Sequence, residues 1–170
     1  MSDHQPEQVL ADFGVLCEAI REFREQGAEV LLCGDLYAHL PASSDYWELG
    51  GEATNVCPQL MQGRQLREAV APNNAGCLLQ AIAATNDCVI TTGRGKGDNG
   101  EGSCVGSFGR HRPSRPNHVL MTPFLYECLV RVEIQHRVQG SDHKPLNLCL
   151  KCVAKGVDLR TRAEGIAVGE

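Results

Sequence analysis

An amphipathic helix that stands directly before a short apolar run gives the first constraint on the fold. Over residues 7–26 the apolar side chains recur at steps of three and four residues, and Gly27 follows as a stop signal. These positions are Val9, Leu10, Phe13, Leu16, Cys17, Ile20 and Phe23. The next run, Val30–Cys33, is continuously apolar and stops at Gly34-Asp35, which is typical of a strand buried on both faces. A helix that leads into a buried strand predicts an α/β fold.

The rest of the sequence mixes helix and strand signals in the same way. Apolar periodicity predicts a second helix over 74–85 and strands over 88–91, 103–108, 118–121, 130–134 and 146–153. Residues 38–72 carry little periodicity, so we expect a long connection of the length that is usually functional or disordered. Gly95, Gly97 and Gly100 have dinucleotide-fingerprint spacing, but no helix signal follows them, and we predict a plain glycine loop over 93–102.

Length and composition narrow the class of protein. A chain of 170 residues fits one domain, and we expect a disordered segment over 1–6, a folded domain over 7–153 and a flexible tail over 154–170. No apolar stretch reaches the roughly 18 residues of a membrane helix, and the N-terminus lacks signal-peptide features. We therefore expect a soluble intracellular protein, cytoplasmic or nuclear, with no membrane partner.

The cysteines favour reduced thiols over a disulfide framework. The chain has 9 cysteines, an odd number, spread through a sequence too long for a small disulfide scaffold. Cys149 and Cys152 form a single C-x-x-C pair, and Cys104 and Cys128 stand alone in the sequence. Structural zinc usually takes four ligands from two such pairs, so the spacing does not predict a zinc site.

Charge is distributed unevenly along the chain. The formal net charge of −5 argues against general adhesion to nucleic acid, whereas residues 93–118 are locally basic. The basic side chains of this segment are Arg94, Lys96, Arg110, Arg112 and Arg115. Such a cluster is usually a solvated surface but can also neutralise a phosphate backbone, while the lack of interleaved aromatic residues gives no support for base stacking. These five residues are candidate contacts to a nucleic-acid backbone, with DNA as the candidate partner.

Two carboxylates stand where a predicted strand meets a loop. Asp35 ends the first apolar run, and Asp142 with His143 precedes the strand predicted over 146–153. Carboxylate oxygens at strand ends suit magnesium, and a neighbouring histidine can act as a base or as a charge partner for phosphate. A single acidic turn after a strand is common in proteins. The two acidic turns at Asp35 and at Asp142-His143, in this order along the chain, predict a joint site.

Five segments together resemble the endonuclease/exonuclease/phosphatase superfamily, which has the deoxyribonuclease-I-like fold, and in particular the endonuclease domains of LINE-type retroelements. They are Gly34–Ala38, Asn74–Leu79, Thr92–Gly100, Arg115–Leu120 and Ser141–Leu146, in the order that the family has them. The resemblance covers about residues 10–152, and the Ser-Asp-His-x-Pro-Leu segment is its most specific part. It implies a partial four-layer α/β sandwich in which a mixed sheet carries flanking helices.

The resemblance also implies magnesium-dependent hydrolysis of phosphodiester bonds in nucleic acid by a water nucleophile. Asp35 would orient or deprotonate the water, His143 would contact the scissile phosphate, and Asp142 and Asp35 would hold the metal. Two positions depart from the family pattern. Tyr37 replaces an asparagine, and Asn117 replaces the aspartate that pairs with the catalytic histidine, so His143 would lack the carboxylate that fixes its tautomer.

The family domain also has an N-terminal half with an asparagine and the metal-binding glutamate, and we find no counterpart in this sequence. We therefore expect a truncated and degenerate domain, weak or inactive alone, that uses magnesium only if active. Two alternatives stay open. The chain is an active magnesium phosphodiesterase completed by another chain that supplies the missing half, or it is a non-enzymatic α/β interaction module whose motif matches are due to chance.

Overall fold

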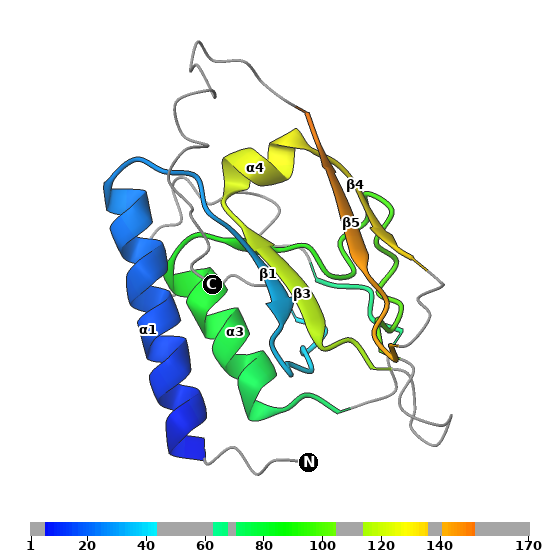
Figure 1. Ribbon diagram of the computed structural model, residues 1–170, viewed down its shortest axis with the longest axis horizontal. Helices are drawn as coiled ribbons and strands as arrows, with labels where there is room; N and C mark the ends of the chain where they lie inside the picture. Colours follow the sequence, from blue (N-terminus) through cyan, green and yellow to red (C-terminus); the bar gives the residue numbers. More distant parts are fainter. Residues whose placement is uncertain (1–5, 44–62, 68–70, 105–113, 136–140, 152–170) are drawn as a thin grey trace, which may run out of the picture.

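Three layers make up the part of the chain that the computed structural model describes, which is residues 6–43, 63–67, 71–104, 114–135 and 141–151, with the backbone alone for 6–9. The elements in chain order are α1 (Pro6–Glu25), β1 (Leu31–Asp35), α3 (Asn74–Thr85), β2 (Val89–Ile90), β3 (Asn117–Met121), α4 (Pro123–Cys128), β4 (Leu129–Ile134) and β5 (Leu146–Leu150). The strands form a three-stranded sheet in the order β1-β3-β2 and a two-stranded sheet of β4 and β5. Figure 1 shows α1 and α3 on one side of the first sheet and the β4-β5 sheet on its other side.

Both faces of the first sheet are apolar, because successive strand residues point to opposite faces. On one face Ile90 and Leu120 pack in a core with Ile20 of α1 and Leu79 of α3. On the other face lies a second core against β4, which consists of Val89, Val119, Met121, Tyr126, Leu129 and Val132. The central sheet is thus covered by helices on one side and by a second sheet on the other.

The two predicted long helices are confirmed, and local chemistry ends each of them. Gly27 follows α1 with a φ of 74°, and its N–H donates to Arg24 O at 2.9 Å, as in a helix-ending glycine turn. Asn73 caps α3 by accepting from the Gly76 N–H at 2.8 Å. A Cβ on Gly76 would lie 1.9 Å from His39 O, so this glycine lets α3 press against the segment that follows β1.

Most predicted strands are also confirmed, as β1, β2, β3, β4 and β5. Of the strand predicted over 103–108, the structure describes residues 103 and 104, and Cys104 is a bridge partner. Residues 105–108 lie outside the described residues. The six-residue helix α4 was not predicted, because one and a half turns beginning at Pro123 show no apolar period.

Two expectations about the sheets are wrong. β1 is not buried on both faces: Leu31 and Leu32 are half-buried and Cys33–Asp35 are exposed, because β1 forms an edge of the described sheet. The expected mixed sheet is also wrong for the described strands, since every ladder is antiparallel. β1 and β2 run in the same direction, but they do not pair with each other because β3 lies between them.

The predicted glycine loop is confirmed, since residues 91–103 contain turns and no helix. The Gln65 N–H donates to Gly93 O at 2.9 Å, and the Arg67 N–H donates to Gly100 O at 3.0 Å. A Cβ on Gly100, where φ is 75°, would lie 1.9 Å from Gln65 O. Gly93 and Gly100 are therefore explained by the close approach of the 63–67 backbone.

Several expectations fall outside the described residues. They concern the N-terminal residues 1–5, the parts of the long connection at 44–62 and 68–70, Cys152 and the tail over 154–170. Among the described helices, none combines the length and apolar character needed to cross a membrane.

Candidate functional site

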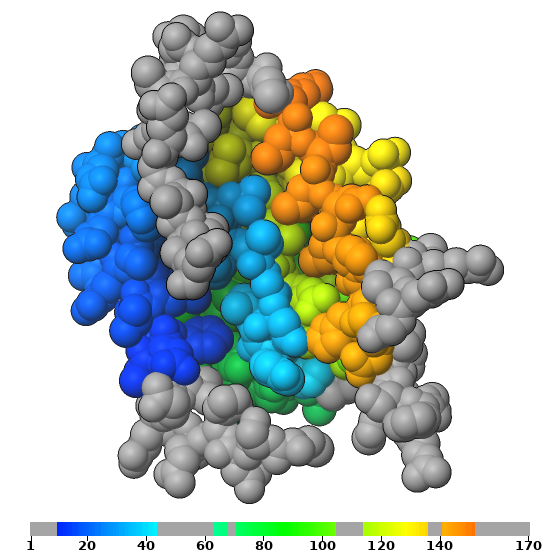
Figure 2. All heavy atoms as spheres, in the orientation of Figure 1, coloured from blue at the N-terminus to red at the C-terminus, as the bar shows by residue number. Residues whose placement is uncertain are grey.

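The end of β1 and the start of β3 bring the first site residues together. Asp35, the last residue of β1, is in register with Asn117, the first residue of β3. His143, from the turn before β5, places its Nδ1 at 3.2 Å from Asn117 Oδ1 and 3.7 Å from Asp35 Oδ2. The structure thus joins the two acidic turns, as the sequence predicted for Asp35 and His143. Figure 2 shows the cyan segment after β1 and the orange residues of β5 on one face of the molecule, with part of the yellow-green β3 between them.

Backbone pairing holds the turn that carries His143. Cys104 bridges Ser114 on one side and His143 on the other, and the Lys144 N–H donates to Ser103 O at 2.6 Å. The Ser141 hydroxyl oxygen accepts the His143 N–H at 3.1 Å, which closes the turn locally. The imidazole therefore projects from a backbone that is held by the bridge to Cys104 and by the Ser141 hydroxyl.

Asn117 sets the tautomer of His143. The Asn117 Nδ2 donates to the Lys144 carbonyl oxygen at 3.5 Å, so its Oδ1 is the atom that faces His143 Nδ1. An amide oxygen only accepts, so this contact requires the proton on Nδ1. As expected, no carboxylate stands at position 117, but the Asn117 side-chain oxygen contacts Nδ1 and the Asp35 carboxylate lies 3.7 Å away.

Asp142 lies close to Cys104, a residue that was not predicted to belong to the site. Cys104 Sγ is 4.0 Å from Asp142 Oδ2. One donor atom each from Cys104, Asp142 and His143 lies within 4.8 Å of the others, and all three residues are half-buried. No sequence signal marked Cys104, because its neighbours come from two distant segments.

This donor set does not fit magnesium. Mg²⁺ takes hard oxygen ligands in octahedral geometry, whereas two of the three clustered donors are a thiol and an imidazole. Asp35 and Asp142 are the carboxylates that the described site contains, and the glutamate that the family resemblance implies has no counterpart among its described residues.

Tyr37, the position where the resemblance implies an asparagine, lies at the rim of the site. Its side chain is 69% exposed, and its backbone is left-handed with a φ of 48°. The Tyr37 N–H donates to Asp35 Oδ1 at 3.1 Å, and its carbonyl accepts from Asn73 Nδ2 at 2.8 Å. The backbone of Tyr37, rather than its side chain, therefore helps to orient the Asp35 carboxylate.

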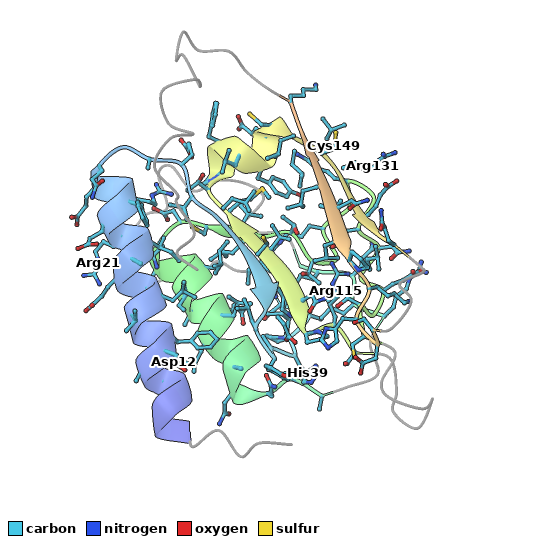
Figure 3. All side chains as sticks on the ribbon, viewed as in Figure 1. Asp12, Arg21, His39, Arg115, Arg131 and Cys149 are labelled. Atoms are coloured by element: carbon cyan, nitrogen blue, oxygen red, sulfur yellow. The ribbon has the colours of Figure 1, made fainter. Side chains whose placement is uncertain are left out.

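Arg115 is not a contact for nucleic acid, which corrects the sequence expectation. Its guanidinium is fully buried and binds the buried Asp98 carboxylate with both terminal nitrogens, at 3.1 and 2.6 Å. It also donates to the carbonyls of Glu101 and Asn117 at 2.9 and 3.1 Å. Figure 3 shows Arg115 among the side chains beside the start of β3. Arg115 therefore ties the glycine loop to β3.

The other basic candidates do not form an exposed patch among the described residues. Arg94 is half-buried and donates to Ile90 O at 2.9 Å. Lys96 lies over the Tyr126 ring, 4.2 Å from its centroid, and donates to the Tyr126 carbonyl. Partial burial lowers the pKa of Lys96. Arg110 and Arg112 lie outside the described residues.

His118, next to Asn117 on β3, is a buried and neutral histidine that the sequence analysis did not single out. Its Nε2 lies 2.7 Å from Ala38 O, which only accepts, so Nε2 carries the proton and Nδ1 accepts from the Thr92 hydroxyl at 2.9 Å. Burial lowers the pKa of His118 to about 4, and the nearby Arg115 charge acts in the same direction. His118 fixes the strand and is closed to solvent, in contrast to His143.

The described chain thus presents one surface cluster of ionisable and thiol groups built from three distant segments. Comparison with known proteins adds no relative to this picture: no family model matches the chain, and neither a curated protein nor a solved structure does.

Proposed function

We propose that this chain is a degenerate endonuclease/exonuclease/phosphatase-like domain that contacts the phosphate backbone of a nucleic acid through His143 and lacks efficient phosphodiester hydrolysis. The observation that carries the proposal is the 3.7 Å separation of His143 Nδ1 and Asp35 Oδ2, whose motifs lie in opposite halves of the sequence. A chance match of two short motifs gives no reason for their side chains to meet.

The layered fold supports the same proposal. Two sheets packed face to face, with helices outside one of them, are three of the layers that a partial four-layer sandwich contains. The side chains of Asp35 and His143 are 31% and 33% exposed, so a phosphate group can reach them from solvent.

The chemistry of His143 suits phosphate contact. Its Nε2, when protonated, is a charged hydrogen-bond donor to a phosphate oxygen, and the contact with Asn117 holds the orientation of the ring. Hydrolysis needs more than this contact. Groups that act together in catalysis fail together, and the described site has neither a magnesium-type ligand set nor the implied glutamate.

Two assays on the purified chain test the proposal. The first is nicking of supercoiled plasmid with Mg²⁺, and the second is anisotropy of a fluorescently labelled DNA duplex at low salt. We expect no nicking above the background of Asp35→Ala, and weaker DNA binding by His143→Ala. Lys151→Ala is the matched control, because Lys151 is an exposed cation just after β5, at the end of that strand remote from His143.

The alternatives give different results. Nicking that both Asp35→Ala and His143→Ala abolish would establish an active phosphodiesterase. DNA binding that is absent, or that His143→Ala weakens no more than Lys151→Ala does, would favour an interaction module of another kind.

A further inference from the structure

We propose that Cys104, Asp142 and His143 form a binding site for a divalent transition-metal ion, with zinc as the ion that their chemistry fits best. The site shares His143 with the proposed function but requires no nucleic acid. Metal binding is measured on the chain without nucleic acid. The metal proposal can therefore fail while the proposed phosphate contact is confirmed, and the phosphate contact can fail while metal binding is confirmed.

The distances between the donor atoms are close to those of a zinc site. Cys104 Sγ and Asp142 Oδ2 are 4.0 Å apart, and all three donors lie within 4.8 Å of one another. Tetrahedral zinc, with bonds of roughly 2.3 Å to sulfur and 2.1 Å to oxygen, would place these two atoms about 3.6 Å apart. Side-chain rotation alone closes such a gap, without movement of the backbone.

The second contact of His143 resembles the support that metal-bound histidines receive. A ligating histidine usually donates its other ring N–H to a carboxylate, carbonyl or amide oxygen, which fixes the tautomer. Here Nδ1 faces Asn117 Oδ1 at 3.2 Å with Asp35 Oδ2 at 3.7 Å, so the ring is already held and Nε2 would be the atom that binds the ion. The contact with Asn117 exists before any ion binds.

The backbone holds the two ligand segments side by side. Cys104 pairs as an isolated bridge with His143 and on its other side with Ser114. Asp142 and His143 are consecutive, so one bridge positions all three side chains. Because the backbone already holds the ligand residues together, ion binding costs side-chain rotamer freedom but little backbone entropy.

The donor types select the ion. A thiolate and an imidazole favour zinc and related transition metals, whereas magnesium prefers oxygen. Three protein ligands leave one coordination position of a tetrahedral ion for water or another small ligand. The three residues are half-buried, so solvent reaches that position.

The test is a titration of the reduced full chain with Co²⁺ under anaerobic conditions, followed by absorption spectroscopy. Cobalt reports directly on its ligands, because a thiolate ligand gives a sulfur-to-metal charge-transfer band and four-coordinate geometry gives intense visible bands. We expect one equivalent to bind, Zn²⁺ to displace it, and a large excess of Mg²⁺ to leave it in place.

Ligand variants assign the bands to residues. Cys104→Ser should lose the charge-transfer band, and Asp142→Asn should keep the band with at least 10-fold weaker binding. Asn117→Ala, which removes the support of His143, should keep the band and weaken binding by about 10–100-fold. Cys33→Ser and Cys149→Ser are the matched controls, since both thiols are exposed and neither belongs to the cluster. Figure 3 shows Cys149 on β5, well away from Arg115 and the start of β3.

Circular dichroism shows whether each variant folds, and if Cys104→Ser does not, Asp142→Asn and Asn117→Ala decide the question. The proposal is overturned if the thiolate band survives in folded Cys104→Ser, if Cys149→Ser removes it, if magnesium displaces cobalt, or if Asp142→Asn and Asn117→Ala bind cobalt as the unmodified chain does.

Discussion

Two acid–base pairs lie close to the start of β3 and differ in almost every physical respect. The Arg115–Asp98 pair is fully buried, with both side chains at 0% exposure and a shortest N–O distance of 2.6 Å. The His143–Asp35 pair is 33% and 31% exposed, and its two atoms are 3.7 Å apart. The first pair is closed to any ligand, whereas the second is open to solvent.

The comparison shows that the formal charge of a residue does not reveal whether the residue binds a ligand or stabilises the fold. Arg115 lies in the basic segment that looked like a binding surface, yet its charge is neutralised inside the molecule by Asp98. A buried charge must be paired because its transfer from water is costly, so this pair holds the loop and the strand together. The exposed pair contributes little to stability, and its groups remain available for chemistry.

The largest expected effect comes from breaking the buried pair. Arg115→Ala should lower the free energy of unfolding by about 3–5 kcal/mol, since it leaves the Asp98 carboxylate buried without its cation. Urea denaturation followed by circular dichroism measures the change. Arg131→Ala is the matched control: its side chain is 59% exposed beside Glu133, and the loss should stay below about 1 kcal/mol. Equal losses of unfolding free energy in Arg115→Ala and Arg131→Ala would contradict the conclusion that the buried pair stabilises the fold more than an exposed pair does.

The two histidines of the same region sharpen the comparison through pH. Burial lowers the pKa of His118 to about 4 from an ordinary value of 6.5, so between these values the unfolded chain binds more protons than the folded one. Stability should therefore fall as the pH is lowered through this window, by roughly 3 kcal/mol from this group. Urea denaturation at a series of pH values gives the slope.

His118→Gln separates this slope from that of the carboxylates. Glutamine does not titrate in this window, so the variant should lose the part of the pH dependence that His118 contributes, even though it starts from a lower stability. His143→Gln is the matched control, because it makes the same replacement at a partly exposed histidine. An unchanged slope in His118→Gln would show that His118 is accessible to protons in the folded chain.

The elements that the sequence predicts correctly are those specified by local pattern. The helices over 7–26 and 74–85 follow from apolar residues on one helical face, and β4 follows from period-two alternation. By contrast, α4 is too short to show a period, and the exposure of β1 depends on which elements cover its end. These features are set by tertiary packing, which a local pattern does not contain.

The candidate site divides in the same way. Asp35 and His143 could be paired in advance, because two motifs in the expected order implied that their turns lie together, although β1 and β5 belong to different sheets. Cys104 and the buried state of Arg115 could not, since each depends on partners from distant segments: Asp142 for Cys104, and Asp98 for Arg115. Sequence shows the chemistry of a side chain, but burial and pairing decide whether it binds a ligand or stabilises the core.

The smallest expected effect tests the open pair itself. Asp35→Asn keeps an oxygen that can accept the Tyr37 N–H, now 3.1 Å from Asp35 Oδ1, and removes only the charge beside His143. The variant should lose about 0–1 kcal/mol of unfolding free energy at a pH where His143 is protonated. Urea denaturation at low and at high salt measures this loss, which should shrink with salt because partly exposed charges are screened. A salt-independent loss as large as that of Arg115→Ala would mean that Asp35 is a structural residue, and phosphate could then not reach this pair without disrupting the fold.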